Sequence, residues 1–99
     1  MAQKEIINIV TRYKESLSDR FDILSVYIFG SYSKETNSED SDIDVAVIVK
    51  NSIQYEDEIE IMKRRRNIDL RIEPHIFSES DFNNPNPLIN EIKRTGIII

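Results

Sequence analysis

The sequence predicts an α/β (α+β) protein in which helices flank a mixed β-sheet. Three observations support this class: a helix-period segment opens the chain, short β-rich runs follow it, and helix-length segments separate those runs. The expected order is helix, strand, short helical turn, strand, helix, strand, helix, strand. Because 99 residues suffice for one compact core and no repeat or linker interrupts them, residues 1–99 are expected to form a single domain.

Helical spacing of apolar residues marks the first element. Its expected buried face consists of Ile6, Val10, Tyr13 and Leu17. The β-rich run 24–29 follows as the first strand and ends at Gly30, a residue that can adopt positive φ. A second, more apolar strand is expected at 43–49. Between the two strands, residues 33–41 are polar and leave room for one helical turn and a loop.

The next helix is expected to start with Ser52 as its N-cap and to end in the basic cluster 63–66. The apolar residues predicted on one side of it are Tyr55, Ile59 and Met62. Residues 58–61 also alternate as a strand would, but the charges around them favour a helix. The basic cluster is interpreted as a solvated helix end, with a partner-docking patch as the alternative.

Regular alternation of apolar and charged residues predicts a third strand at 68–73, and Pro74 is expected to end its regular pairing. Asn86-Pro87 is typical of a helix start, and Gly96 of a helix end. The final residues, 97–99, are expected to form a closing strand.

Composition excludes several classes of function. The net charge of −5 argues against an extended nucleic-acid surface. The longest apolar run, 45–49, is far shorter than the roughly 20 residues of a spanning helix, and the opening residues lack the apolar core of a signal peptide, so we expect no membrane contact and a cytoplasmic location. The absence of cysteine excludes disulfides and thiolate zinc sites, so any metal is expected to have oxygen ligands.

Two alternating aspartates form the candidate site. Asp42 and Asp44 are expected on one face of the second strand, with Cα atoms roughly 6.5 Å apart, because strand side chains repeat every second residue. Two carboxylates beside an apolar strand repel each other, and a hard cation such as Mg²⁺ compensates their charge. The pair therefore predicts a metal site.

Three further residues are candidates for the same site. Asp69 lies on the polar face of the expected third strand and would join the pair if that strand lies beside the second. On that face Arg71 is expected to form an ion pair with Asp69. Gly30 and Ser31 offer N–H groups and a hydroxyl suited to a phosphate. Metal and phosphate sites together indicate a nucleotide.

Plainer interpretations compete with this site. Taken alone, residues 39–42 are typical of a solvated turn. A calcium loop is a second alternative, but Val45 stands where such loops need glycine and Asn51 where they need glutamate. The single histidine, His75, has no spaced partner and is interpreted as a structural or surface residue.

Gly30-Ser31, ten further residues and then Asp42-Ile-Asp44 in an apolar strand together resemble the minimal nucleotidyltransferases of the DNA polymerase β superfamily. Either motif alone is weak, whereas the two at this spacing are specific. The resemblance covers nearly the whole chain, because family members are similarly short, place a third carboxylate on a later strand and often close with a glycine-bounded apolar segment.

The resemblance implies a Mg²⁺-dependent nucleotidyltransferase. In it, Asp42 and Asp44 would bind two metal ions, Asp69 would complete the catalytic site, and Gly30 and Ser31 would hold the triphosphate of ATP. A hydroxyl acceptor would attack the α-phosphorus and release pyrophosphate. The resemblance also implies a partner: family members of this size often act as antitoxins that transfer AMP to a small helical protein, commonly of the HEPN type.

One departure from the family and two alternative functions accompany this prediction. Lys34-Glu35 stands where an Arg-Gly pair is common, so a negative charge lies near the expected phosphates and glycine's flexibility is lost. The first alternative is a non-catalytic binding module that neutralises a partner by docking. The second is a small-molecule (antibiotic) nucleotidyltransferase; these carry a further helical domain, so a homo-oligomer would have to build the pocket.

Overall fold

The computed structural model describes residues 3–30 and 42–99. Its elements are α1 (Gln3–Ser18), β1 (Ile23–Phe29), β2 (Ile43–Val49), α2 (Tyr55–Arg64), the 3₁₀ turn η1 (Arg65–Asn67), β3 (Ile72–Ser78), α3 (Glu79–Phe82), α4 (Pro87–Thr95) and β4 (Ile97–Ile98). None of these helices is long and apolar enough to cross a membrane. The predicted helical turn within 33–41, together with Ser31, Lys34 and Glu35, lies outside the described residues.

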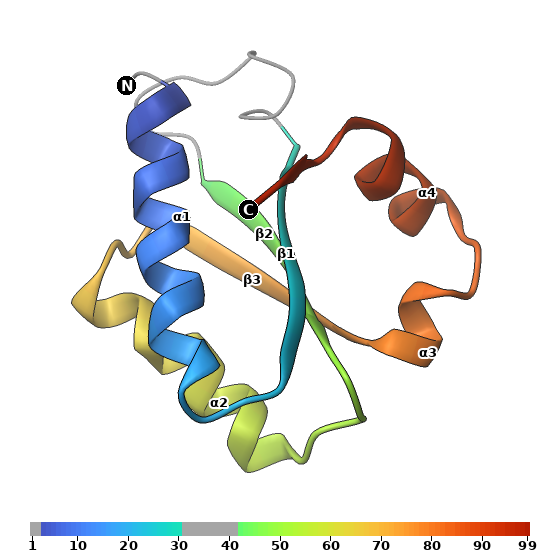
Figure 1. Ribbon diagram of the computed structural model, residues 1–99, viewed down its shortest axis with the longest axis horizontal. Helices are drawn as coiled ribbons and strands as arrows, with labels where there is room; N and C mark the ends of the chain where they lie inside the picture. The colour runs from blue at the N-terminus through green and yellow to red at the C-terminus, as the bar shows by residue number, and fades with distance from the viewer. Residues whose placement is uncertain (1–2, 31–41) are drawn as a thin grey trace.

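The strands form one mixed sheet in the order β3-β2-β1-β4. β1 runs antiparallel to both β2 and β4, whereas β2 and β3 are parallel and are joined by the crossover that contains α2. Helices α1 and α2 lie on one side of the sheet, and α3 and α4 on the other (Figure 1). The predicted fold class, a mixed sheet flanked by helices, is confirmed.

Two apolar layers fill the space between the sheet and the helices. In β2, Val45 and Val47 pack under α1 and α2, while Ala46 and Ile48 pack under α3 and α4. Because β2 is buried on both faces, its sequence is an almost unbroken apolar run. Asp44 is the one polar residue in that run, and alternation puts it on the face covered by α3 and α4.

The first and last helices agree with their predicted patterns. The four residues expected to face the sheet from α1 are all buried. The side chain of Asn86 caps α4 by accepting a hydrogen bond from the backbone N–H of Ile89 at 2.9 Å, and Gly96 follows the helix as its C-cap. The apolar closing strand is present as β4 and pairs with β1.

The predicted start of the second helix is wrong, whereas Tyr55, Ile59 and Met62 lie together along one side of it as predicted. Gln54, and not Ser52, stands at the N-cap, and its side chain makes no capping hydrogen bond. Tyr55 is 72% exposed and Met62 41% exposed, whereas Ile61 is fully buried. The side of α2 that carries Ile61 is buried because it packs against α1. There the buried hydroxyl of Tyr13 donates a hydrogen bond to the carbonyl of Ile61.

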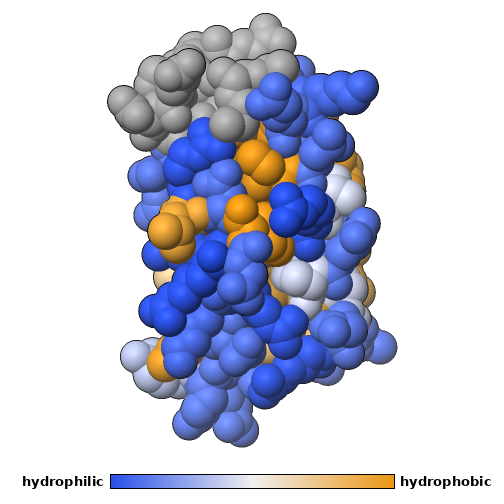
Figure 2. Space-filling model, turned by 90° about the vertical axis from the view of Figure 1, so that its left-hand side faces the viewer, coloured by the Kyte–Doolittle hydropathy of each residue, from blue (hydrophilic) through white to orange (hydrophobic). Residues whose placement is uncertain are grey.

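The outer surface of these two helices is mainly hydrophilic. Figure 2 views the side of the molecule on which α1 and α2 lie, and its apolar side chains emerge in small groups rather than as one broad area. Scattered apolar residues of this kind are normal on a protein surface. The exposed apolar side of α2 is therefore part of an otherwise polar face.

The predicted bounds of the third strand are also wrong. β3 runs over Ile72–Ser78, and residues 68–71 form turns before it. Pro74 does not end the pairing: it is buried and lies opposite Val45 in the ladder with β2. Since β3 is an edge strand, a residue without an N–H donor is tolerated on its open side.

Candidate functional site

The end of β1 and the start of β2 meet at one edge of the sheet. Asp42 directly precedes β2 and is exposed, and Asp44 is the second residue of the strand. Asp44 lies opposite Phe29, the last residue of β1, so that Gly30 follows next to it. The structure thus brings together the glycine and the aspartates that the sequence singled out. Ser31 lies outside the described residues.

Gly30 is packed directly against the carboxylate of Asp44. Its φ is +76°, a value that side chains disfavour. A Cβ on Gly30 would lie 2.6 Å from Oδ2 of Asp44, so only glycine fits here without a shift. The backbone at Gly30 therefore lies directly against Asp44, the candidate metal ligand.

Glu73 is the carboxylate that the sheet register sets beside Asp44. The two residues are partners in the parallel ladder between β2 and β3, and ladder partners share one face of a sheet. Glu73 is exposed. The predicted strand 68–73 contained both Asp69 and Glu73, and the sequence did not indicate that Glu73 would lie beside Asp44. The observed strand begins at Ile72, so it includes Glu73 and excludes Asp69.

Asp69 lies in the turn before β3, not on the strand where it was predicted. Its Oδ2 accepts a hydrogen bond from Nη2 of Arg71 at 2.7 Å, and its Oδ1 accepts one from Nε at 3.0 Å and another from the backbone N–H of Arg71 at 2.9 Å. These hydrogen bonds lower the pKa of Asp69 below its ordinary value, against a smaller opposing effect of burial. The predicted ion pair is confirmed. A metal role for Asp69 stays a prediction.

His75 is a second residue that sequence reasoning left without a role. Its Nε2 is 3.5 Å from Oδ1 of Asp44, and this nitrogen is buried without a hydrogen-bond partner in the described part of the chain. The ring packs edge-on against Phe29, with 5.2 Å between ring centroids. His75 lies opposite Ala46, on the same face of the sheet as Asp44 and Glu73.

The chemistry of these side chains fits a divalent cation. Asp42, Asp44 and Glu73 offer carboxylate oxygens at one edge of the sheet. His75 directs at Asp44 a nitrogen that has no hydrogen-bond partner among the described residues. Within residues 3–30 and 42–99, no group of three Asp, Glu, His or Cys side chains is close enough to enclose an ion. Such a site suits a metal that keeps several water or phosphate ligands, as Mg²⁺ commonly does.

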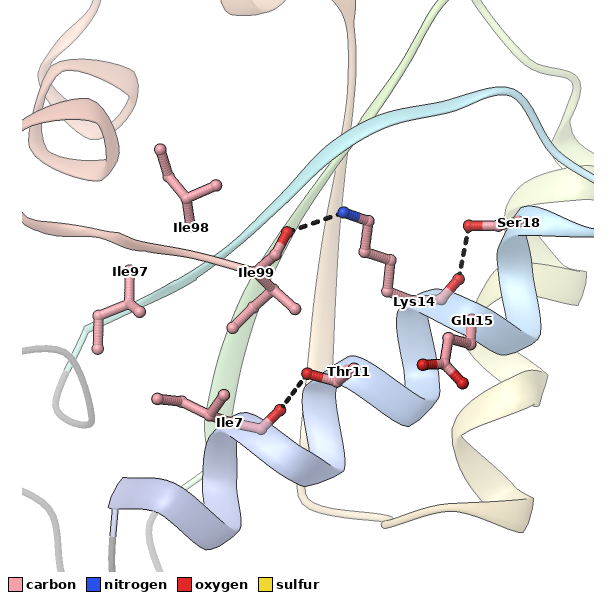
Figure 3. A pocket seen from close by; sticks show the side chains of 8 residues that line it. All are labelled: Ile7, Thr11, Lys14, Glu15, Ser18, Ile97, Ile98 and Ile99. Atoms are coloured by element: carbon pink, nitrogen blue, oxygen red, sulfur yellow. Dashed lines mark hydrogen bonds between the residues drawn. The ribbon is translucent and has the colours of Figure 1, made fainter.

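A separate groove lies between α1 and β4, away from the aspartates. It has a volume of about 550 Å³. Figure 3 shows its lining side chains, which include Ile7, Ile97 and Ile99. Lys14 crosses it to donate a hydrogen bond from Nζ to the carbonyl of Ile99 at 2.8 Å. Among the described residues that line the groove, Glu15 is the one acidic side chain, so the groove is a poor candidate for the metal site.

The family model described as "Polymerase beta, Nucleotidyltransferase" matches residues 5–99. The chain belongs to this family. The family prediction made from the glycine-serine and aspartate motifs is thereby confirmed. Membership of the polymerase beta nucleotidyltransferase family also agrees with the site geometry, in which Gly30 lies against Asp44.

Two curated relatives carry names from the same family. The protein adenylyltransferase MntA of Thermococcus cleftensis is 41% identical over 44 residues, which make up 44% of each chain, so the matched part spans less than half of that relative. A Methanocaldococcus jannaschii protein, provisionally assigned as a protein adenylyltransferase, is 28% identical over 81 residues, or 82% of each chain.

Solved structures share the fold. A toxin-antitoxin crystallised with AMP-PNP has a TM-score of 0.63 at 20% identity, over 99% of this chain and 72% of that one. A Sulfolobus solfataricus protein provisionally assigned as a nucleotidyltransferase has a TM-score of 0.66 at 20% identity, over 97% of this chain and 80% of that one. At this identity the likeness establishes the architecture of the sheet and helices.

Proposed function

We propose that this chain transfers a nucleoside monophosphate, AMP from ATP, to a hydroxyl group of a partner protein, with Mg²⁺ as the expected cation. The observation that carries the proposal is the contact between Gly30 and Asp44, because it joins the two halves of the family motif at one edge of the sheet. A phosphate-binding turn and a metal-binding carboxylate are the two parts that nucleotidyl transfer needs next to each other.

Each residue has a distinct part in this reaction. Asp42 and Asp44 would hold the metal, with Glu73 as the third carboxylate and the predicted Asp69 as the alternative. The bound cation would supply positive charge to the entering and leaving oxygens. The turn at Gly30, followed by Ser31, would bind the triphosphate through backbone N–H groups and the hydroxyl.

The proposed reaction balances as a single displacement at phosphorus. The oxygen of the acceptor hydroxyl forms a bond to the α-phosphorus, and the bond from that phosphorus to the bridging oxygen breaks and releases pyrophosphate. The acceptor proton passes to a carboxylate of the site or to water. Glu73 is the candidate base, because it lies beside Asp44 and is exposed to an incoming acceptor.

The proposed acceptor is a protein that forms a toxin-antitoxin pair with this chain. Two comparisons support this choice: a relative is named protein adenylyltransferase MntA, and a structural neighbour is a toxin-antitoxin crystallised with AMP-PNP. We expect the partner to be a small helical protein of the HEPN type, with this chain acting as its antitoxin. The proposal therefore joins nucleotide chemistry and protein recognition in one molecule.

The test is a variant that carries Asp42→Asn and Asp44→Asn. It is mixed with the partner, labelled ATP and Mg²⁺, and the label on the partner and the relief of toxicity in cells are both followed. The control, Glu56→Gln with Glu58→Gln, removes the same charge from two exposed residues of α2. We expect the site variant to stay folded, to transfer no AMP and to leave the partner toxic, while the control behaves as the parent.

Two results would contradict the proposal. If the site variant relieves toxicity as well as the parent while transferring nothing, the chain acts by docking and not by catalysis. If ATP binds with equal affinity in the presence and absence of Mg²⁺, the assignment of the aspartate pair to the metal is wrong.

A further inference from the structure

We propose that His75 is a nitrogen ligand of the cation held by Asp44, so that this site binds Mn²⁺ or Co²⁺ more tightly than Mg²⁺. The inference rests on the proposed function only in taking Asp42 and Asp44 as the metal-binding pair. It concerns a residue that belongs to neither half of the family motif.

The distance between the two side chains is the first argument. Nε2 of His75 and Oδ1 of Asp44 are 3.5 Å apart. An N–H···O hydrogen bond spans about 2.7–3.2 Å, so this pair is too far apart for a good one. Two ligands at about 2.1 Å from one ion, separated by an angle of about 90–110°, are roughly 3.0–3.4 Å apart. The observed separation is close to that of neighbouring ligands around an ion.

The environment of the ring is the second argument. The T-shaped contact with Phe29 and the position of His75 within the ladder between β3 and β2 orient the imidazole. Its Nε2 is buried, yet no hydrogen bond satisfies it within the described residues. A buried polar atom without a partner costs free energy, and a metal ion is one of the partners that removes this cost.

The choice of metal follows from the type of donor. Mg²⁺ prefers oxygen ligands and gains little from an imidazole, whereas the affinity of transition-metal cations for nitrogen rises from Mn²⁺, which still favours oxygen, to Co²⁺. A carboxylate and an imidazole from adjacent strands supply one donor of each kind. Phosphate oxygens of the nucleotide and water would complete the coordination. This differs from the expectation that any metal in the chain has oxygen ligands alone.

The chain has a single histidine, and this allows a direct spectroscopic test. Protein without a histidine tag is prepared with ¹⁵N only in histidine and is mixed with Mn²⁺ and α,β-methylene-ATP, which cannot be cleaved at the α-phosphorus. Pulsed electron paramagnetic resonance of the bound Mn²⁺ is then recorded. We expect a ¹⁵N coupling from a directly bound imidazole, and its absence would overturn the proposal.

Calorimetry of Co²⁺ and Mg²⁺ binding gives a second, independent measurement. In His75→Gln we expect Co²⁺ affinity to fall about tenfold or more, with Mg²⁺ affinity changed by less than about twofold. His75→Phe retains a ring against Phe29 and should give the same selective loss. Equal losses for the two ions would mean that His75 only supports the structure, and would overturn the proposal.

A third variant separates this inference from the proposed function. If Asp42→Asn with Asp44→Asn abolishes Mn²⁺ binding while the His75 variants keep the parent's ratio of affinities, only the inference about His75 fails. If the aspartate variant binds Mn²⁺ as tightly as the parent, the metal site itself is misassigned and both proposals fail.

Discussion

Gly30 leaves no room for a side chain beside Asp44: a Cβ at this position would lie 2.6 Å from Oδ2 of the aspartate. The positive φ of Gly30 and this close approach have one origin, the turn by which the chain leaves β1 against the first residues of β2. The spacing between the glycine and the aspartates in the sequence therefore corresponds to a direct contact in the fold.

We predict that Gly30→Ala destabilises the protein and weakens nucleotide binding. The left-handed backbone conformation alone costs an alanine about 1–2 kcal/mol, and displacement of the Asp44 carboxylate adds to it. Urea unfolding measures the first effect and nucleotide titration with Mg²⁺ the second.

The same substitution in an Asp44→Ala background is the control. Oδ2 is then absent, so Gly30→Ala should cost less free energy of unfolding, and only the backbone cost should remain. An equal cost in both backgrounds would show that Asp44 does not resist the added Cβ.

We predict that Glu73→Gln mainly lowers transfer activity and metal affinity, whereas Asp69→Asn mainly lowers stability. Glu73 lies beside Asp44 in the ladder, so its loss should lower transfer activity and metal affinity by about tenfold or more with little change in stability. Asp69 is bound to Arg71 in the turn before β3, so its loss should lower stability first. Metal titration and urea unfolding of both variants check this, and the reverse profile would restore Asp69 as the third carboxylate.

The ion pair between Asp69 and Arg71 should also appear in the dependence of stability on pH. The hydrogen bonds from Arg71 lower the pKa of Asp69 in the folded protein below the ordinary value of 3.8. A carboxyl whose pKa is lower when folded stabilises the protein above its unfolded pKa, and this contribution disappears as the pH falls through the folded pKa.

We therefore expect the free energy of unfolding of the parent to fall more steeply below about pH 4 than that of Asp69→Asn. Urea unfolding between about pH 6 and pH 2.5 measures both curves. Parallel curves for the two proteins would mean that the ion pair adds no stability in solution.

We predict that Tyr13→Phe lowers the free energy of unfolding by about 1 kcal/mol, the usual contribution of a buried neutral hydrogen bond. The hydroxyl of Tyr13 donates to the carbonyl of Ile61, and burial raises the pKa of Tyr13 above its usual value, so it stays a donor. Tyr55→Phe is the matched control, because Tyr55 is 72% exposed and its change should have no measurable effect on thermal unfolding.

Elements with a strong local pattern could be predicted from the sequence. The buried face of α1, the apolar run of β2 and the cap at Asn86 each depend on residues close together in the chain. The start of β3, by contrast, does not depend on nearby residues alone. Alternation extends from Ile68 through Ile72, and only pairing with β2 decides which part of it becomes strand.

The same limit applies to the candidate site. Gly30 and the two aspartates could be chosen from their spacing, whereas Glu73 depends on the register of the ladder between β2 and β3. His75 has no sequence signal of its own, because its proximity to Asp44 arises from that same register. Pro74 suggested that the strand ended before His75, whereas Glu73 lay within the predicted strand but had no sign of its pairing with Asp44.

The parallel pairing of β2 with β3 also has a consequence for folding kinetics. β1 and β2 are antiparallel neighbours along the chain, so the contact between Gly30 and Asp44 can form as soon as this pair does. Glu73 and His75 reach Asp44 only after the crossover through α2 has closed, which costs additional chain entropy. An early folding intermediate that contains β1 and β2 would hold the aspartates without their partners on β3, so competence to bind the metal would arise late in folding.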